Sequence, residues 1–360
     1  MGRRPRAVPN DADPCRWCGA GSFCDAGERG ALILAGGTEI VAVDIGGTHA
    51  RFAMATIADD GSITLGEPVT LHTDDHASFQ TAWEDYRDRQ GGTLPDGVAM
   101  AIAGPIDDQI IRFTNNPWII RPPLIREKLG CSRFTIVNDF AAVAHAAARA
   151  PAEQFLHLAG PDTELPATGT ISVLGPGTGL GVAYFWRGDG GAVHVQATEG
   201  GHGDFAPVDA IEDAILARLR KRHNRVSDER VVSGPGIVDI YQTLAAMEGR
   251  AVMDLDDIAI WTAAALGDDS LAAAAVDRFC MALGSVAGNI ALIQGAGGVV
   301  IAGGLGYRIR ETLLNSGFAS RFTAKGRFSG LMATLPVKLI VHPQPGLYGA
   351  AAAFAKEHCA

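Results

Sequence analysis

The sequence predicts an α/β fold, and three observations support this prediction. Short apolar runs rich in β-branched residues end at a glycine or a polar residue, as buried strands do. Helix-like segments follow several of these runs, which is typical of sheets covered by helices. The pattern of strand, glycine-rich turn and strand occurs twice, about 130 residues apart, and this spacing predicts two related domains facing one another across a cleft.

The first copy of the pattern contains two polar residues that end predicted strands. Its apolar runs lie at residues 40–44, 49–55, 98–103 and 135–137, and an alanine-rich helix follows at 140–148. Asp44 ends the first run, and Asn138-Asp139 follow the last. Ligands of α/β sheets bind at the carboxyl ends of strands, so we expect Asp44 and Asp139 to lie near a ligand.

The second copy continues to the end of the chain. We predict strands at 170–174, 182–186, 299–301 and 337–341, and helices at 209–223, 236–247, 254–266 and 347–356. Residues 279–307 carry no charge and are numerous enough to span a membrane. However, Gln294 and the glycines after it divide the stretch into a helix and a short strand, so we interpret it as a buried core segment and expect no membrane association.

Composition bounds the classes of function. The chain has 360 residues, of which 47% are hydrophobic and 19% charged, so it can bury a large core. A formal net charge of −10 argues against a general nucleic-acid binder, because affinity for a phosphate backbone comes from clustered Lys and Arg. Any phosphate must therefore be held locally. Glycine accounts for 45 of the 360 residues, and this surplus predicts turns where the backbone approaches a ligand closely.

Residues 1–38 are predicted to form a disordered N-terminal extension. They contain Cys15 and Cys18 at the spacing of half a zinc site, and Cys24, but no second pair of ligands follows nearby. Arg3-Arg4 is not followed by the apolar segment of an export signal. We therefore expect a cytoplasmic protein.

Two glycine turns are candidates for binding a polyphosphate. No G-x-G-x-x-G fingerprint and no Gly-Lys-Ser/Thr is present, which argues against a dinucleotide fold and a P-loop. The turns Asp44 to Thr48 and Gly177 to Gly179 offer backbone N–H groups and the hydroxyls of Thr48 and Thr178 to an anion. Asp44 is suited to Mg²⁺, usually through water. Either turn alone is equally well explained as a tight hairpin, whereas both together favour a triphosphate.

The motifs resemble those of the actin-like ATPase and sugar-kinase superfamily. The likeness lies in 44–48 and 175–181, as two phosphate loops, and in 301–305, as an adenosine-side loop. Further segments at 114–118, 137–140, 199–207, 229–236 and 345–349 resemble bacterial glucokinases. No cysteine-rich loop surrounds His202, so the resemblance is to the group without a zinc loop.

This resemblance implies a fold, a reaction and a set of site residues. The fold is α/β, with two actin-like (ribonuclease H-like) domains flanking an interdomain cleft: a small domain of 39–149 plus 342–360 and a large domain of 150–341. The reaction is ATP-dependent phosphorylation of glucose at its 6-hydroxyl in glycolysis, with Asp139 as general base and Mg²⁺ at Asp44. The implied sugar-binding residues are Asn115, Asn138, Asp139, Glu199, His202 and Glu229. The implied nucleotide-binding residues are Asp44, Ile45, Gly46, Gly47, Thr48, Gly177, Thr178, Gly179, Gly303 and Gly304. Family analogy also suggests a homodimer.

Alternatives remain open for the residues and for the function. Asp139 precedes a helix and is also suited to cap it. Glu199-x-x-His202 has the spacing of a metal pair, although two glycines between them disfavour the helix that such pairs use. Glu229-Arg230 is equally suited to an exposed ion pair. A kinase for another hexose or an amino sugar, or a sugar and nucleotide sensor without turnover, are the alternative functions.

Overall fold

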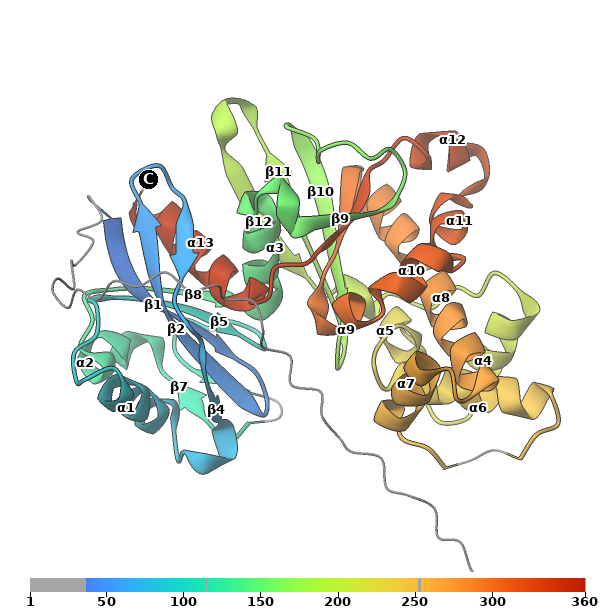
Figure 1. Ribbon diagram of the computed structural model, residues 1–360, viewed down its shortest axis with the longest axis horizontal. Helices are drawn as coiled ribbons and strands as arrows, with labels where there is room; N and C mark the ends of the chain where they lie inside the picture. Colours follow the sequence, from blue (N-terminus) through green and yellow to red (C-terminus); the bar gives the residue numbers. More distant parts are fainter. Residues whose placement is uncertain (1–36, 114–115, 252–253, 360) are drawn as a thin grey trace, which may run out of the picture. The chain divides into compact units, whose positions relative to one another are not determined.

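The computed structural model describes residues 37–113, 116–251 and 254–359 (Figure 1). Strand β1 (Gly37–Ile45) begins two residues before the domain start expected at 39. Most of the predicted N-terminal extension, with its cysteines, lies outside the described residues, and so does Asn115. The predicted domain boundaries at 149/150 and 341/342 stay a prediction.

The first sheet is built around β1. Its strand order is β3 (Ile63–Leu65), β2 (His49–Ala58), β1, β5 (Gly97–Ile102), β8 (Arg133–Asn138), and β4 (Val69–His72) pairs with β2. β1 is antiparallel to β2 and parallel to β5, which is parallel to β8. Alternate β1 residues face opposite sides, as the pleat requires. Val41 and Val43 belong to the core shared with α1 (Phe79–Arg89) and α2 (Ile125–Leu129), whereas Ile40 and Ala42 belong to the core shared with α13 (Pro345–His358).

The second sheet repeats this topology. Its order is β12 (Val193–Thr198), β11 (Leu180–Arg187), β10 (Gly169–Pro176), β13 (Ala296–Ile301), β14 (Val337–Ile340), β9 (Phe155–Ala159). Three antiparallel strands are again followed by two parallel ones, and an antiparallel edge strand is added. The predicted α/β fold with a repeated strand, turn and strand unit is therefore confirmed. A small third sheet pairs β6 (Ile111–Arg112) with β7 (Ile119–Ile120).

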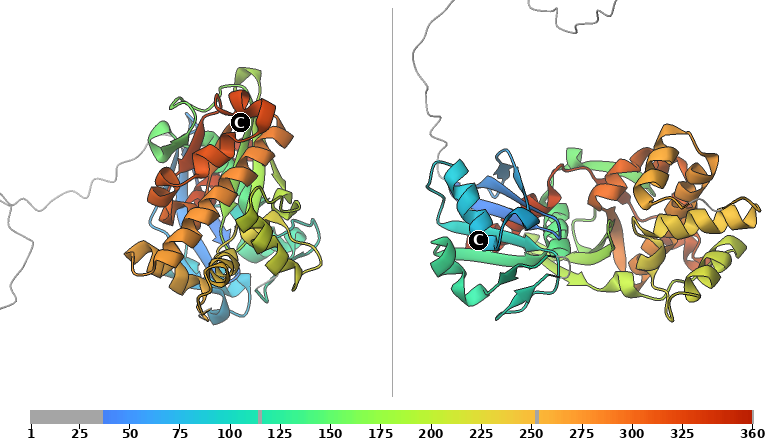
Figure 2. Two further views of the ribbon diagram at one scale, coloured as in Figure 1. Left: turned by 90° about the vertical axis from the view of Figure 1, so that its right-hand side faces the viewer. Right: turned by 90° about the horizontal axis from the view of Figure 1, so that it is seen from below.

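Helices cover both faces of the second sheet. α3 (Asp139–Arg149) shares a core with Ile171 and Val173 on one face. The other face packs against α8 (Ser270–Gln294), on which several further helices lie (Figure 2). The helices that pack on α8 are α5 (Asp228–Val231), α6 (Gly236–Met247), α7 (Asp257–Leu266), α10 (Arg310–Asn315) and α11 (Phe318–Thr323). Around them, α4 (Ala210–Arg220) packs on α6, α9 (Gly303–Arg308) on β10 and β14, and α12 (Ser329–Met332) on α11.

The first part of the uncharged stretch forms the C-terminal part of α8. Among the described residues, α8 is the one helix that is long and apolar enough to cross a membrane, yet 67% of its most apolar segment is buried inside the fold. The helix ends at Gln294, as predicted, because Gly295 adopts a left-handed conformation with φ of 61°. Its burial agrees with a core helix.

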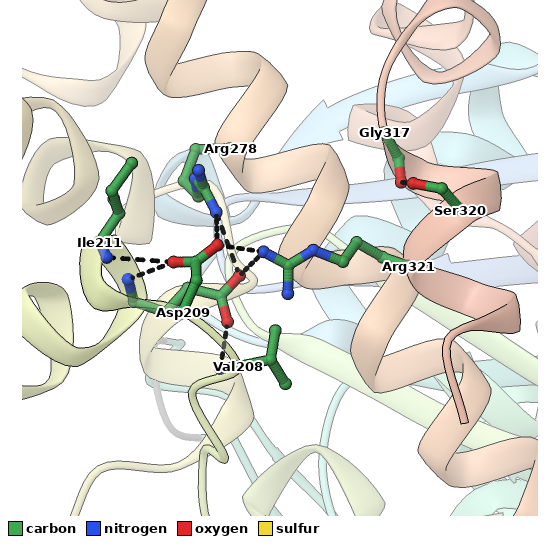
Figure 3. Close-up of polar contacts among 8 residues, drawn as sticks. Val208, Asp209, Ile211, Arg278, Gly317, Ser320 and Arg321 are labelled. Atoms are coloured by element: carbon green, nitrogen blue, oxygen red, sulfur yellow. Dashed lines mark hydrogen bonds and ion pairs between the residues drawn. The ribbon is translucent and has the colours of Figure 1, made fainter. Parts of the chain in front are cut away.

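A buried ion-pair cluster joins α4, α8 and α11 (Figure 3). Asp209 caps α4, and its carboxylate contacts the guanidinium groups of Arg278 and Arg321. Glu212, which is only 1% exposed, lies 3.6 Å from Arg278 and 3.4 Å from Arg321. Two carboxylates thus face two guanidinium groups, so the cluster buries no net charge.

Four predicted helices differ from the structure at their ends, and one of them, α3, is one residue longer at each end than the predicted 140–148. Asp209 and Asp256 cap α4 and α7 with their side chains, so these helices begin one or more residues later than predicted. α13 extends beyond the predicted 347–356 at both ends because Pro345 is well suited to a first helical turn.

Candidate active site

The first glycine turn places the Asp44 carboxylate at the end of β1. Asp44 lies opposite Arg51 in the β1–β2 hairpin, and Arg51 Nη1 is 3.3 Å from Asp44 Oδ2. Burial raises the pKa of the Asp44 carboxyl, and the charge and hydrogen bond of Arg51 offset this only in part. The side chain keeps 22% of its surface exposed. A partly desolvated carboxylate with one open side is a suitable ligand for a cation.

The start of α13 lies against this carboxylate. A Cβ at Gly346 would be 2.7 Å from Asp44 Oδ2, so only glycine fits there. The N-terminus of a helix carries a partial positive charge, which favours a nearby anion. The Pro-Gly-Leu-Tyr-Gly motif therefore completes the surroundings of Asp44, a role that nothing in its sequence pattern indicated.

The same turn leaves backbone N–H groups available. Its carbonyl oxygens are occupied: Asn116 Nδ2 donates to Gly46 O (3.3 Å), Thr73 Oγ1 to Gly47 O (2.9 Å) and the Thr73 amide to Thr48 O (3.0 Å). Within the described part of the chain, the amides of Gly47 and Thr48 have no hydrogen-bond partner. Successive free amides in a turn suit an anion.

The second glycine turn is fixed by backbone contacts. The Gly177 amide donates to Gly179 O (2.8 Å), and the Gly234 amide donates to Gly177 O (2.7 Å). Gly303, at a φ of 87°, approaches the end of β10 so closely that a Cβ there would be 2.9 Å from Pro176 O. Because β10 and β13 are adjacent and parallel, the predicted second phosphate loop and the predicted adenosine loop lie side by side.

Asp139 is the first residue of α3, and Asn138 caps the helix. Asn138 Oδ1 accepts hydrogen bonds from the amides of Phe140 (2.9 Å) and Ala141 (3.2 Å), and its Nδ2 donates to Gly104 O (3.2 Å). The alternative in which Asp139 is the helix cap is therefore wrong, because the preceding side chain already occupies that position. Asp139 Oδ1 accepts from the Phe140 amide alone (2.9 Å).

The pKa of the Asp139 carboxyl is raised to about 6. Burial is the largest cause, the Phe140 amide opposes it, and the negative charges of Asp44 and Glu199 add to it. The group thus interacts with the first glycine turn and with the predicted sugar residues at once. A carboxyl with such a pKa is suited to accept a proton near neutral pH.

Phe140 connects Asp139 to the second glycine turn. A Cβ at Gly181 would lie 2.1 Å from Phe140 Cδ2, and one at Gly175 would lie 2.6 Å from Phe140 Cζ. The ring therefore fills a space that two absent side chains leave on β10 and β11. Gly175 and Gly181, which lie in the predicted second phosphate loop, therefore allow α3 to pack against β10 and β11. The spacing of the glycines did not indicate this role.

Glu199 and His202, three residues apart in one turn, meet Glu229 of α5. His202 Nε2 is 3.8 Å from Glu199 Oε2, and His202 Nδ1 is 3.9 Å from Glu229 Oε1. Glu229 Oε2 accepts a hydrogen bond from the Leu180 amide (3.0 Å), and a Cβ at Gly179 would be only 2.4 Å away from it. Glycine at this position thus lets Glu229 reach the turn.

Several alternatives for these residues can now be compared with the structure. Glu229 faces His202 and Leu180, not a surface arginine. Among the described residues, no group of three or more His, Cys, Asp or Glu side chains is arranged to hold a metal ion. The sequence analysis did not assign a role at the site to three residues, Arg51, Gly346 and Phe140. The sequence could have indicated only Arg51, because a hairpin closed by Gly46–Thr48 pairs it with Asp44.

Comparisons with known proteins agree with this arrangement. The family model described as Glucokinase matches residues 41–357. A glucokinase of Zymomonas mobilis is 53% identical over 320 residues, covering 89% of this chain and 98% of that protein, and one of Caulobacter vibrioides is 43% identical over 339 residues, covering 92% and 98%. The crystal structure of a glucokinase from an Antarctic psychrotroph superposes with a TM-score of 0.79 at 34% identity, covering 88% and 99% of the two chains. The chain therefore belongs to the glucokinase family.

Proposed function

We propose that this protein transfers the γ-phosphoryl group of ATP to the 6-hydroxyl of glucose, giving glucose 6-phosphate and ADP, with Asp139 as general base. Family membership supports the reaction. The position of Asp139 is the observation that supports its assignment as the base. Its carboxylate interacts electrostatically with Asp44 in one predicted phosphate turn and with Glu199 in the predicted sugar cluster.

Asp139 would take the proton of the attacking hydroxyl. A sugar hydroxyl is a weak nucleophile at neutral pH, and phosphoryl transfer depends mostly on positioning and on charge stabilisation. Burial and neighbouring carboxylates give Asp139 a pKa of about 6, so it is ionised at pH 7 yet basic enough to accept a proton. Its second oxygen, Oδ2, makes no hydrogen bond with the described residues and is available to the substrate.

Glu199, His202 and Glu229 would hold vicinal hydroxyls on the C1 to C3 side of the sugar. Carboxylates accept hydrogen bonds and an imidazole either donates or accepts, so the three match a row of hydroxyl groups. Asn138 would contribute on the C4 to C6 side together with Asp139, although its amide already caps α3 and contacts Gly104 O. Asn115 stays a prediction.

The two glycine turns would bind the phosphates of ATP. Gly47, Thr48 and Thr178 would donate, while Gly303 and Gly304 would lie against the adenosine; Ile45, Gly46, Gly177 and Gly179 would shape the turns. Asp44 fits Mg²⁺, because its carboxylate is only partly neutralised by Arg51 and keeps one side open. When bound with ATP, Mg²⁺ would neutralise phosphate charge in a protein that is itself acidic.

A panel of hexoses tests this proposal. ADP release should require glucose, and an Asp139→Ala variant should lose it about 100-fold or more. Asp277→Ala removes an exposed carboxylate from α8 and should leave the rate unchanged. Turnover with another hexose or an amino sugar but not with glucose would favour that alternative kinase. Binding of glucose and ATP without turnover would favour a sensor.

The remaining elements of the proposal rest on family analogy. We propose a cytoplasmic homodimer that supplies glucose 6-phosphate to glycolysis. Light scattering coupled to gel filtration measures the oligomeric state directly, and a monomer at micromolar concentration would contradict the dimer.

A further inference from the structure

A pocket lies at the far end of α3. Its volume is about 670 Å³, and it is formed by the last turns of α3, by α13 and by the β11–β12 hairpin, which lie close together in Figure 1. Pockets of roughly 300–1,000 Å³ are typical of small-molecule sites. Small apolar residues, including Ala148 and Ala192, form part of its wall.

The polar lining of this pocket is entirely basic. It consists of His145, Arg149, Arg187, His194 and Lys356, with no Asp or Glu among the lining residues. Across the described residues, none of these five side chains forms an ion pair with a carboxylate. Arg149, Arg187 and Lys356 thus bring three positive charges, without a carboxylate partner in the part of the chain that the structure describes, into one pocket of a protein with a net charge of −10.

The basic groups repel one another in the absence of a ligand. The pKa of His145 is lowered to about 4, first by burial and then by the charges of Lys356 and Arg149. Burial also lowers the pKa of Arg187, and the charge of Glu164 offsets this only in part. The Arg187 guanidinium donates to two carbonyl oxygens, with Nη1 2.9 Å from Pro166 O and Nη2 3.0 Å from Ala148 O, and lies over the Phe185 ring at 5.2 Å from its centroid. An anion would relieve this repulsion.

The pocket is separate from the candidate active site. His145 and Arg149 lie six and ten residues after Asp139 on α3. At 1.5 Å per residue, the two ends of the helix are about 15 Å apart. None of the residues predicted to bind sugar or nucleotide lines the pocket.

We propose that this basic pocket is a binding site for a small phosphate-bearing anion, either free phosphate or a phosphate monoester. Arginine and lysine side chains are the usual partners of phosphate oxygens, and two histidines add further donors. The volume accommodates a phosphate together with a sugar-sized group. The proposed site is distinct from the catalytic one, since none of the residues predicted to bind sugar or nucleotide lines it.

Calorimetric titration of the full-length protein tests this proposal, with sodium phosphate and glucose 6-phosphate as separate probes. The test variant is Arg149→Gln combined with Lys356→Gln, two exposed side chains. The matched control is Arg220→Gln with Lys221→Gln, which removes the same charge from exposed positions at the end of α4. We expect the wild type and the control to bind phosphate at one site, and the test variant to bind about tenfold more weakly or not at all.

The two probes separate the sources of phosphate. Equal affinity for both would support recognition of the phosphate group alone, whereas tighter binding of glucose 6-phosphate that the test variant loses would support a sugar phosphate. Because glucose 6-phosphate is also the product expected at the candidate active site, only the binding that the test variant loses is assigned to the pocket. Binding of both probes that is the same in the test variant and the control, or no binding of either probe by the wild type at about 10 mM, would overturn the proposal. Unchanged turnover of the test variant shows that it folds, and His194→Gln serves as a second, milder variant.

Discussion

Replacing Asp139 with asparagine should stabilise the folded protein at alkaline pH while removing its activity. An aspartate carboxyl has an ordinary pKa of 3.8, whereas the pKa of Asp139 in the folded protein is about 6. A difference of about 2 units, at 1.36 kcal/mol each, corresponds to about 3 kcal/mol of destabilisation when the group is ionised in the fold. Asparagine keeps an oxygen that can accept from the Phe140 amide but carries no charge, so it removes most of this penalty.

The gain in stability should depend on pH in one direction. Between pH 3.8 and 6 the folded protein holds a proton that the unfolded chain has released, so the stability of the wild type falls as pH rises through this range. The advantage of Asp139→Asn should therefore be largest at pH 8 and smaller by about 1.4 kcal/mol at pH 5. Urea unfolding followed by circular dichroism at both pH values measures this difference.

Asp228→Asn is the matched control for this experiment. Burial raises the pKa of Asp228 to about 7, Asp204 adds to the rise, and Lys325 opposes it. This variant should also gain stability at alkaline pH but keep its turnover, whereas Asp139→Asn should lose about 100-fold or more. Equal stability of Asp139→Asn and wild type at pH 8, or full activity of Asp139→Asn, would refute the reasoning.

Three further substitutions test the packing and charge contacts. Gly179→Ala would place a Cβ 2.4 Å from Glu229 Oε2; displacing this carboxylate should raise the KM for glucose about tenfold in steady-state assays, and an unchanged KM would argue against Glu229 as a sugar ligand. Gly349→Ala would place a Cβ 1.7 Å from Ala142 O; separating α13 from α3 should lower the free energy of unfolding in urea by about 1–3 kcal/mol, and a wild-type value would contradict the close packing. Arg321→Met leaves buried Glu212 with Arg278 as its one remaining cation in the cluster; we expect a loss of about 3 kcal/mol in the same assay, and a neutral effect would mean that the cluster does not stabilise the fold.

The fold was predictable because its signals are local. β-Branched runs ending at glycine mark β1 and β10, and the helix ending at Gln294 was predicted from the glycines that follow it. The sequence analysis did not predict strand β12 or the short helices α9 to α12. β12 alternates only between intermediate and exposed residues, and the helices are too short to show a clear periodic pattern. Their conformation depends on tertiary packing more than on propensity.

The sequence predicted which residues belong to the candidate site, but it did not predict the contacts between them. Motifs indicated Asp139, Glu199, His202 and Glu229, yet the distances between them depend on how β8, β12 and α5 meet. Gly346 against Asp44 illustrates the limit, because the two are about 300 positions apart and share no local pattern. The basic pocket could not be predicted from the sequence for the same reason, because its charged residues come from three segments that are distant in the chain.

The dependence of kcat/KM for glucose on pH tests the central assignment most directly. If Asp139 is the general base, the wild-type value should fall on the acid side with an apparent pKa of about 6, as the carboxyl becomes protonated. The residual activity of Asp139→Asn should lack this acid limb. A wild-type profile that stays level below pH 6, or the same acid limb in Asp139→Asn, would contradict the assignment.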